Sequence, residues 1–123
     1  MKKHILLIDD DQDELNLLQD ALQELAIPHK CTWAKSGRQA LEQLRYLEPD
    51  IIFLDVNMPH MNGLECLAGI KQLPGRQKIP VILCSTGMNA DISRSGLQAG
   101  AAACIKKANT FTELSAVLDK YLK

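Results

Sequence analysis

A chain of 123 residues, of which 46% are hydrophobic, suits one globular domain with a single core and argues against disorder. Its formal net charge is −1 and it has no basic run longer than a lysine pair, so we expect no binding of nucleic acid through bulk electrostatics. Its apolar segments are too short for a signal peptide or a membrane span. We therefore expect one domain over residues 1–123, located in the cytoplasm and not in a membrane.

The four cysteines lie far apart, without the C-x-x-C spacing of a zinc site. Cys84 and Cys104 fall in apolar runs, where a free thiol packs as a small hydrophobe. The three histidines are equally scattered. We expect free thiols in a reducing compartment and no metal site built from cysteine or histidine.

Five short apolar runs predict five β-strands. The runs at residues 4–8, 50–54 and 80–84 are continuously apolar, as in central strands that are covered on both faces of a parallel sheet. The run at residues 30–34 mixes apolar and polar side chains, which is typical of an edge strand. The last run covers residues 102–105.

Between these runs, apolar residues recur every three or four positions, as they do in amphipathic helices. We expect each of these stripes to pack into the core. The stripes contain Leu15, Leu18, Leu22 and Leu25; Ala40, Leu41, Leu44 and Leu47; Leu64, Leu67, Ala68 and Leu73; Ile92, Leu97 and Ala99; and Phe111, Leu114, Val117, Leu118 and Tyr121.

Alternating strands and helices predict an α/β fold with right-handed crossovers and a doubly wound parallel sheet. Such sheets bind ligands beyond the carboxyl ends of their strands. In an open sheet of this kind we expect the first and third strands to be neighbours. Residues that follow these two strands are therefore the first candidates for a functional site.

Carboxylates follow both strands. Asp9 and Asp10 come directly after the first strand, and Asp55 follows the third. Three carboxylates gathered in one crevice repel one another unless a cation joins them. Oxygen ligands without a nearby cysteine or histidine suit Mg²⁺, with Mn²⁺ as a second possibility. The next acid, Asp11, forms an Asp-x-x-Glu pattern with Glu14, which predicts a capping box at the start of the first helix.

The fourth and fifth strands add a hydroxyl and an ammonium group at the same edge. Ser85 and Thr86 end the fourth strand, and Lys106 and Lys107 end the fifth. A metal site, a point charge and a hydrogen-bond donor are the groups that phosphoryl transfer requires. The chain contains no P-loop and no G-x-G-x-x-G motif, so it lacks a standard nucleotide-binding loop of its own.

The segments "LLIDDD", "DIIFLDVNMPHMNG", "PVILCSTG" and "GAAACIKK" carry a resemblance to a known family. Together they resemble the receiver domain of response regulators in two-component signalling, of the single-domain type that resembles chemotaxis regulators. The resemblance covers the whole chain. It implies a flavodoxin-like (βα)5 fold, whose five parallel strands lie in the order 2-1-3-4-5.

The resemblance also implies roles for the acids. Asp55 matches the family's phosphoacceptor. Asp10 matches the acid that binds the metal directly, and Asp9 the acid that acts through water. Asn57, two residues after the phosphoacceptor, would bind the metal through its backbone carbonyl.

Two further roles follow from matching the other segments. Ser85 corresponds to the family's switch hydroxyl. Lys107 corresponds to the phosphoryl-binding lysine, which leaves Lys106 as a surface residue. The chain departs from the family pattern at Ala108, where a proline usually follows the lysine, and at Cys104, where an aromatic residue usually stands.

The implied function is a phosphoacceptor with Mg²⁺. Asp55 would take a phosphoryl group from a sensor histidine kinase or phosphotransfer protein, and the fourth helix, fifth strand and fifth helix would then bind a downstream protein. Such a domain is not an enzyme beyond its own phosphorylation and dephosphorylation. Three alternatives remain: a small Mg²⁺-dependent phosphatase, which Asn57 in place of a second acid argues against; a pseudo-receiver; and a receiver fragment of a longer regulator.

Overall fold

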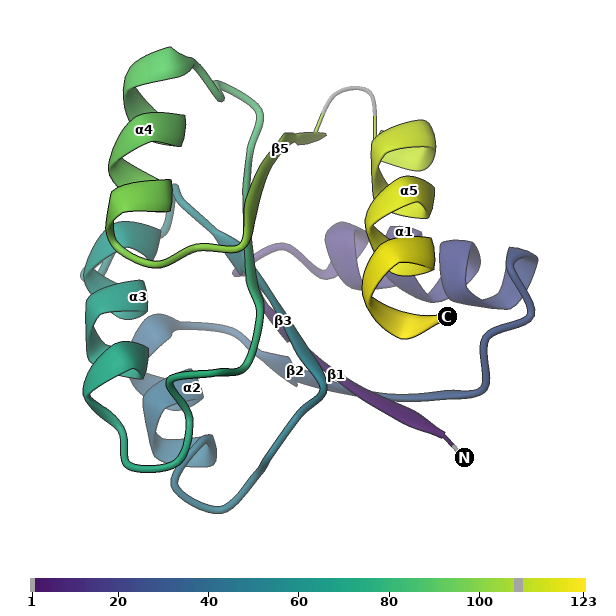
Figure 1. Ribbon diagram of the computed structural model, residues 1–123, viewed down its shortest axis with the longest axis horizontal. Helices are drawn as coiled ribbons and strands as arrows, with labels where there is room; N and C mark the ends of the chain where they lie inside the picture. The colour runs from purple at the N-terminus through teal and green to yellow at the C-terminus, as the bar shows by residue number, and fades with distance from the viewer. Residues whose placement is uncertain (1, 108–109) are drawn as a thin grey trace.

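Five parallel strands form one sheet in the order β2-β1-β3-β4-β5 in the computed structural model of the protein (Figure 1). The structure describes residues 2–107 and 110–123. The strands are β1 (Lys3–Ile8), β2 (His29–Ala34), β3 (Ile51–Asp55), β4 (Val81–Ser85) and β5 (Ala103–Lys106). This order confirms the predicted flavodoxin-like fold, with β2 as an edge strand.

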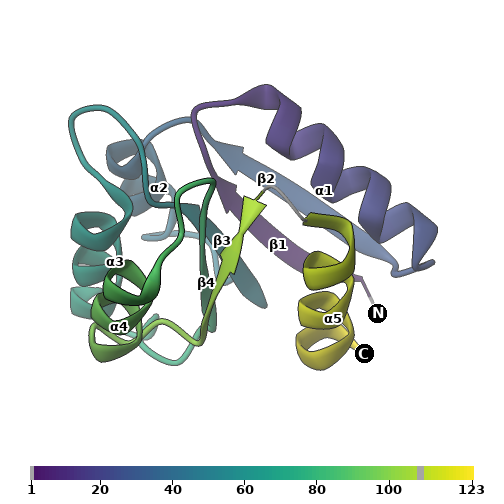
Figure 2. The ribbon, with the colours of Figure 1, turned by 90° about the horizontal axis from the view of Figure 1, so that it is seen from above.

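Helices cover both faces of the sheet (Figures 1 and 2). The helices are α1 (Gln12–Glu24), α2 (Gly37–Gln43), α3 (Gly63–Gln72), α4 (Ala90–Gln98) and α5 (Thr110–Leu122). Helices α1 and α5 pack against one face, and α2, α3 and α4 pack against the other. All residues of β3 and β4 are buried, as predicted for continuously apolar strands between two helical layers.

Most of the predicted helical stripes lie in the core, but two need correction. Ala68 of α3 is exposed, and Cys66 and Ile70 are buried instead. In α4, Leu97 is 51% exposed and Ala99 is also exposed. The predicted position of Phe111 falls outside the described side chains.

Helix α4 approaches the sheet most closely at a glycine. Gly96 is the buried residue of this helix. A Cβ atom at this position would overlap the side chain of Leu83 and lie 3.1 Å from the Sγ of Cys104. The backbone of α4 therefore lies almost directly on β4 and β5 at this position, while Ile92 packs against the core and Leu97 lies toward solvent.

The helices that follow β1, β3 and β4 begin with polar caps. Asp11, Asn62 and Asn89 accept hydrogen bonds from the first-turn amides of α1, α3 and α4. Only Asn62 forms a capping box, with Glu65, among the caps that the structure describes. The capping box predicted for Asp11 was wrong, because the Asp11 carboxylate accepts from the N–H of Asp13 and the Glu14 side chain turns toward a lysine.

The state of the cysteines agrees with the prediction. All four cysteines are free thiols. Among the described residues, no helix is both long enough and apolar enough to cross a membrane.

Gly63 should be intolerant of a side chain, because it fits against the end of β3. Its N–H donates to the Val56 carbonyl at 2.9 Å, and a Cβ atom would lie 2.7 Å from the Val56 Cα and overlap the Asp55 carbonyl. We expect Gly63→Ala to lower the free energy of unfolding by about 1–3 kcal/mol, measured by urea denaturation. Gly87→Ala is the matched control, since its nearest neighbour is the Ser85 Oγ at 4.0 Å. Equal stability of the two variants would contradict the close contact.

Candidate functional site

Asp9, Asp10 and Asp55 gather at the carboxyl edge of the sheet. Strand β1 pairs with β3 so that Ile8 lies beside Leu54, and the next residues on both strands are therefore aspartates. Each of the three carboxylates offers an oxygen, and these oxygens all lie within 4.8 Å of one another. Asp9 and Asp55 are 2% and 4% exposed, whereas Asp10 is open to solvent.

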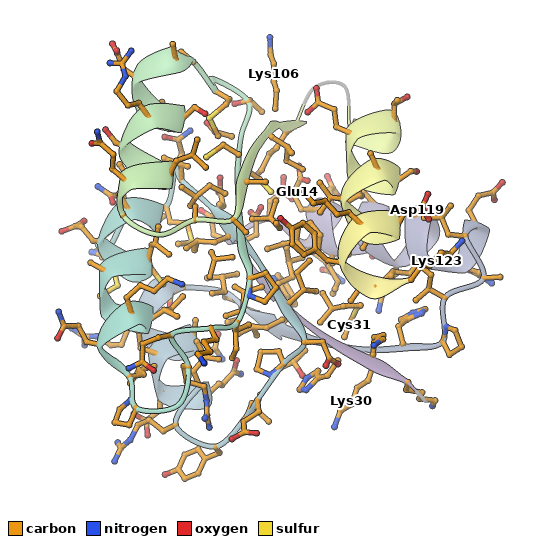
Figure 3. All side chains as sticks on the ribbon, viewed as in Figure 1. Glu14, Lys30, Cys31, Lys106, Asp119 and Lys123 are labelled. Carbon is orange, nitrogen blue, oxygen red and sulfur yellow. The ribbon has the colours of Figure 1, made fainter. Side chains whose placement is uncertain are left out.

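Lys107 is the cation of this crevice. Its Nζ lies 2.7 Å from the Oδ2 of Asp9 and 3.2 Å from the Oδ1 of Asp55. Lys106 projects away from the body of the protein (Figure 3), and its backbone N–H donates to Glu113. Lys107, directly after β5, thus lies against the acids, and it is the lysine that matches the family's phosphoryl-binding residue.

The charges perturb one another. Burial raises the pKa of Asp55 above its ordinary value, and the negative charge of Asp9 raises it further. The ammonium group of Lys107 and the N–H of Asn57 oppose this shift. Burial alone would lower the pKa of Lys107, but its hydrogen bond to Asp9 and the nearby carboxylates raise it above its ordinary value. Lys107 is therefore a permanent cation at neutral pH.

Glu14 is a fourth acid of the crevice that the sequence analysis missed. Its Oε1 lies 3.9 Å from the Nζ of Lys107, and burial raises the pKa of its carboxyl group. The sequence pattern assigned Glu14 to a capping box. The position of Glu14 offered a second signal, because a helix that starts at the carboxyl edge of a sheet points first-turn side chains toward that edge.

Ser85 is held by two donors. It is fully buried, and its Oγ accepts hydrogen bonds from the Nδ2 of Asn57 at 3.0 Å and from the N–H of Gly87 at 3.1 Å. A hydroxyl has two acceptor sites and one donor, so the Ser85 O–H stays available to a third group. The neighbouring Thr86 is exposed. The bond from Asn57 to Ser85 was not predicted, because sequence reasoning assigned only the backbone of Asn57.

The donor set fits a divalent cation such as Mg²⁺ or Mn²⁺. All the candidate ligand atoms are oxygens, and no cysteine or histidine joins the acidic cluster in the part of the chain that the structure describes. The single ammonium of Lys107 leaves Asp9, Asp10 and Asp55 with an excess of negative charge. A cation bound beside Asp10, on the open side of the crevice, would offset this repulsion.

Both departures from the family pattern lie at or near β5. Cys104 is half-buried, and its Sγ donates to the Ser93 carbonyl of α4 at 3.7 Å. The geometry of the bond between Lys107 and Ala108 falls outside the described residues.

Comparison with known proteins decides the family. The family model for the response regulator receiver domain matches residues 5–119 of the sequence. The chain belongs to the response regulator receiver domain family. The match covers all five strands, and it confirms the resemblance that the four sequence segments carried.

Curated relatives include longer proteins. The response regulator Rcp1 of Synechocystis sp. is 34% identical over 96 residues, which cover 72% of this chain and 65% of Rcp1. The transcriptional regulatory protein ZraR of Escherichia coli is 35% identical over 118 residues, which cover 96% of this chain and 26% of ZraR. The chain thus spans about two thirds of the first relative and about a quarter of the second.

Solved structures of receiver domains share the fold along the whole chain. The phosphorylated cyanobacterial phytochrome response regulator RcpA gives a TM-score of 0.90 at 29% identity, over 100% of this chain and 96% of RcpA. The Mn²⁺-bound form of Rcp1 gives a TM-score of 0.86 at 27% identity, over 98% of this chain and 95% of Rcp1.

The raised pKa of Asp55 predicts that Asp55→Asn stabilises the metal-free protein at neutral pH. When a carboxyl group has a higher pKa in the folded state than in the unfolded state, the unfolded state loses its proton first as the pH rises. The free energy of unfolding therefore falls as the pH rises between the two pKa values. Above both values the ionised carboxylate of Asp55 destabilises the fold, and Asn removes this charge. We expect a higher free energy of unfolding for Asp55→Asn at about pH 7 and a gain that disappears below about pH 4.

The measurement is urea denaturation in the presence of a chelator at several pH values. Asp20→Asn, at an exposed acid of α1, is the control for loss of a charge and should show no such gain. A gain for Asp55→Asn that stays constant across the pH range would contradict the electrostatic explanation.

Proposed function

We propose that Asp55 accepts a phosphoryl group from the phosphohistidine of a sensor histidine kinase or phosphotransfer protein, and that the domain then presents a changed protein-binding surface. The observation that carries this proposal is the position of the Asp55 carboxylate. It is buried at the end of β3, next to Asp9 and Asp10 and 3.2 Å from the ammonium of Lys107.

The proposed step is a transfer between two nucleophiles. An oxygen of the Asp55 carboxylate attacks the phosphorus atom and forms a P–O bond, while the P–N bond breaks and its electron pair returns to the imidazole ring. The N–H of Asn57, 3.2 Å from the Oδ1 of Asp55, restricts the rotation of the carboxylate. Lys107 and the O–H of Ser85 provide positive charge and a hydrogen bond for the phosphoryl oxygens.

A divalent cation would be held by Asp10, Asp55 and the backbone carbonyl of Asn57, with Asp9 acting through water. Mg²⁺ is the favoured ion, and Mn²⁺ suits the same oxygen ligands. When bound, the cation neutralises negative charge on the transferred group and the acids. Asp9 has both carboxylate oxygens engaged already, by Lys107 and by the N–H of Asp11 at 3.0 Å, which leaves Asp10 the more accessible ligand.

Catalysis in this proposal is confined to the domain's own acyl phosphate, which forms on Asp55 and is later hydrolysed by water. A phosphatase of similar fold is disfavoured. Such an enzyme needs a second acid beside the nucleophile to protonate the leaving group, and position 57 carries an amide. The Nδ2 of Asn57 already donates to Ser85.

The proposed output surface consists of α4, β5 and α5, and it binds a downstream protein and not nucleic acid. Phosphorylation adds a charge of about −1.5 to −2 beside Ser85. The hydroxyl then moves toward the phosphoryl oxygens and shifts residues 85–91, which lead into α4. Cys104 has no ring to follow this movement, so the coupling depends on this loop and on the contact of Gly96 with Leu83 and Cys104.

Incubation with acetyl phosphate and Mg²⁺ should add about 80 Da, the mass of one phosphoryl group, as measured by intact mass spectrometry. The adduct should require Mg²⁺ and should be lost at alkaline pH, because acyl phosphates hydrolyse there. Asp55→Asn should abolish it, and Asp50→Asn, at an exposed acid before the same strand, should retain it. An adduct of the same mass on Asp55→Asn would show that another residue is the acceptor.

The two lysines at the end of β5 should differ in their effect on phosphorylation. We expect Lys107→Ala to slow the reaction with acetyl phosphate about 100-fold, because the ammonium stabilises charge on the transferred group. Lys106→Ala, whose side chain points to solvent, should react at nearly the rate of the unmodified protein. The rates are measured by intact mass spectrometry. In Lys107→Ala the Mg²⁺ affinity, measured by calorimetry, should change less than the rate. A greater loss of rate in Lys106→Ala would reverse the assignment.

A further inference from the structure

The only tryptophan of the chain contacts the backbone of a candidate metal acid. The Nε1–H of Trp33, near the end of β2, donates to the carbonyl oxygen of Asp9 at 2.8 Å. The N–H of Asp9 donates to the carbonyl of Ala34 at 3.1 Å. Both backbone polar groups of Asp9 are therefore bonded to the end of β2.

The indole N–H replaces a bond that the sheet does not supply. The pairing of β1 with β2 ends at Ile8 and Ala34, so the Asp9 carbonyl lies one residue beyond the ladder. A buried carbonyl without a hydrogen-bond donor destabilises the fold. Trp33 satisfies this group at the point where β1 gives way to the turn that carries Asp10 and Asp11.

The ring itself is held from several sides. It is partly buried and packs against the core between α1, α5 and the sheet. The ammonium of Lys35 lies 5.1 Å from the centroid of the ring, a distance at which a cation is attracted to the aromatic face. The indole ring is rigid and has few rotatable bonds, so it can fix the position of the Asp9 carbonyl better than a flexible side chain with an amide or hydroxyl group can.

The turn after Asp9 has little other support from the sheet. The Oδ1 of Asp9 accepts from the N–H of Asp11, which closes the turn on itself. Asp10, between these two residues, is exposed to solvent. The direction of the Asp10 carboxylate therefore depends on where the backbone of Asp9 is held.

We propose that Trp33 is a positioning residue for the metal site. Its indole N–H fixes the backbone of the turn after β1, so that the carboxylates of Asp9 and Asp10 meet Asp55 around a divalent cation. This role rests on the proposed function, because it presupposes that the three acids bind Mg²⁺.

The test separates the N–H from the volume of the ring. Because Trp33 is the only tryptophan, growth with β-(3-benzothienyl)alanine replaces this residue alone and exchanges the N–H for sulfur while keeping the shape of the ring. We expect the Mg²⁺ dissociation constant, measured by calorimetry with MgCl₂, to rise about five-fold, which corresponds to about 1 kcal/mol for one hydrogen bond. Trp33→Phe should show a rise at least as large.

Two controls distinguish positioning from packing. Replacement of Trp33 by 5-fluorotryptophan retains the N–H and should leave the dissociation constant unchanged. Cys31→Ala removes a contact that β2 makes with the same core cluster, at a position paired with Ile5, well before the acids that follow β1. It should lower the melting temperature without changing Mg²⁺ affinity.

The outcomes also separate this inference from the proposed function. If the unmodified protein binds no Mg²⁺ and gains no phosphoryl group, the proposed function fails. If the unmodified protein binds Mg²⁺ and the benzothienyl protein binds it equally well, the metal site stands and the role of Trp33 is overturned. Because the sulfur analogue keeps the volume of the ring, unfolding of Trp33→Phe would not obscure the result.

Discussion

The repulsion between two buried carboxylates, Asp9 and Asp55, is the constraint on which the carboxyl edge of this sheet depends. Neighbouring parallel strands bring the two groups together, and Lys107, 98 positions after Asp9 in the sequence, supplies the ammonium that offsets their charges. The site therefore exists only when the sheet is complete, because β5 lies on the far side of β4 from the acids. An ion pair thus joins the segments that directly follow the first and last strands of the sheet.

The same balance explains how a local chemical change can alter the domain. Lys107 is shared by Asp9, Asp55 and, at a longer distance, Glu14. If Asp55 accepts a phosphoryl group, as proposed, it would add a charge of about −1.5 to −2 to an environment that already has too little positive charge. The ammonium of Lys107 and the hydroxyl of Ser85 would then have a stronger acceptor than the ones they have now. A modification shifts a two-state equilibrium only when it interacts differently with the two states, and a stronger acceptor beside Lys107 and Ser85 is such an interaction.

Sequence patterns predicted the five strands and the gathering of the acids, because both follow from local features, whereas the full strand order was implied by the family resemblance. Continuous apolar runs identify buried strands, and residues that follow adjacent parallel strands must share an edge. The roles assigned to the site residues remain predictions. What could not be predicted depends on contacts between distant segments. These contacts are the bond from Trp33 to Asp9, the packing of α4 on the sheet at Gly96, and the hydrogen bonds from the buried Arg76 to the carbonyls of Leu44 and Leu47.

Hydrogen bonds also connect the acidic crevice to the segment before α4. The backbone N–H of Asn57 donates to Asp55, its side chain donates to the Ser85 hydroxyl, and the N–H of Gly87 donates to the same hydroxyl. If Ser85 moves toward a phosphoryl group, it must either leave these donors or draw Gly87 with it. Helix α4 has little room to absorb such a shift, because Gly96 places its backbone against β4 and β5 without an intervening side chain. Under the proposed function, a shift of this loop would therefore displace α4 as a whole across the contact of Gly96 with Leu83 and Cys104, where no aromatic side chain intervenes.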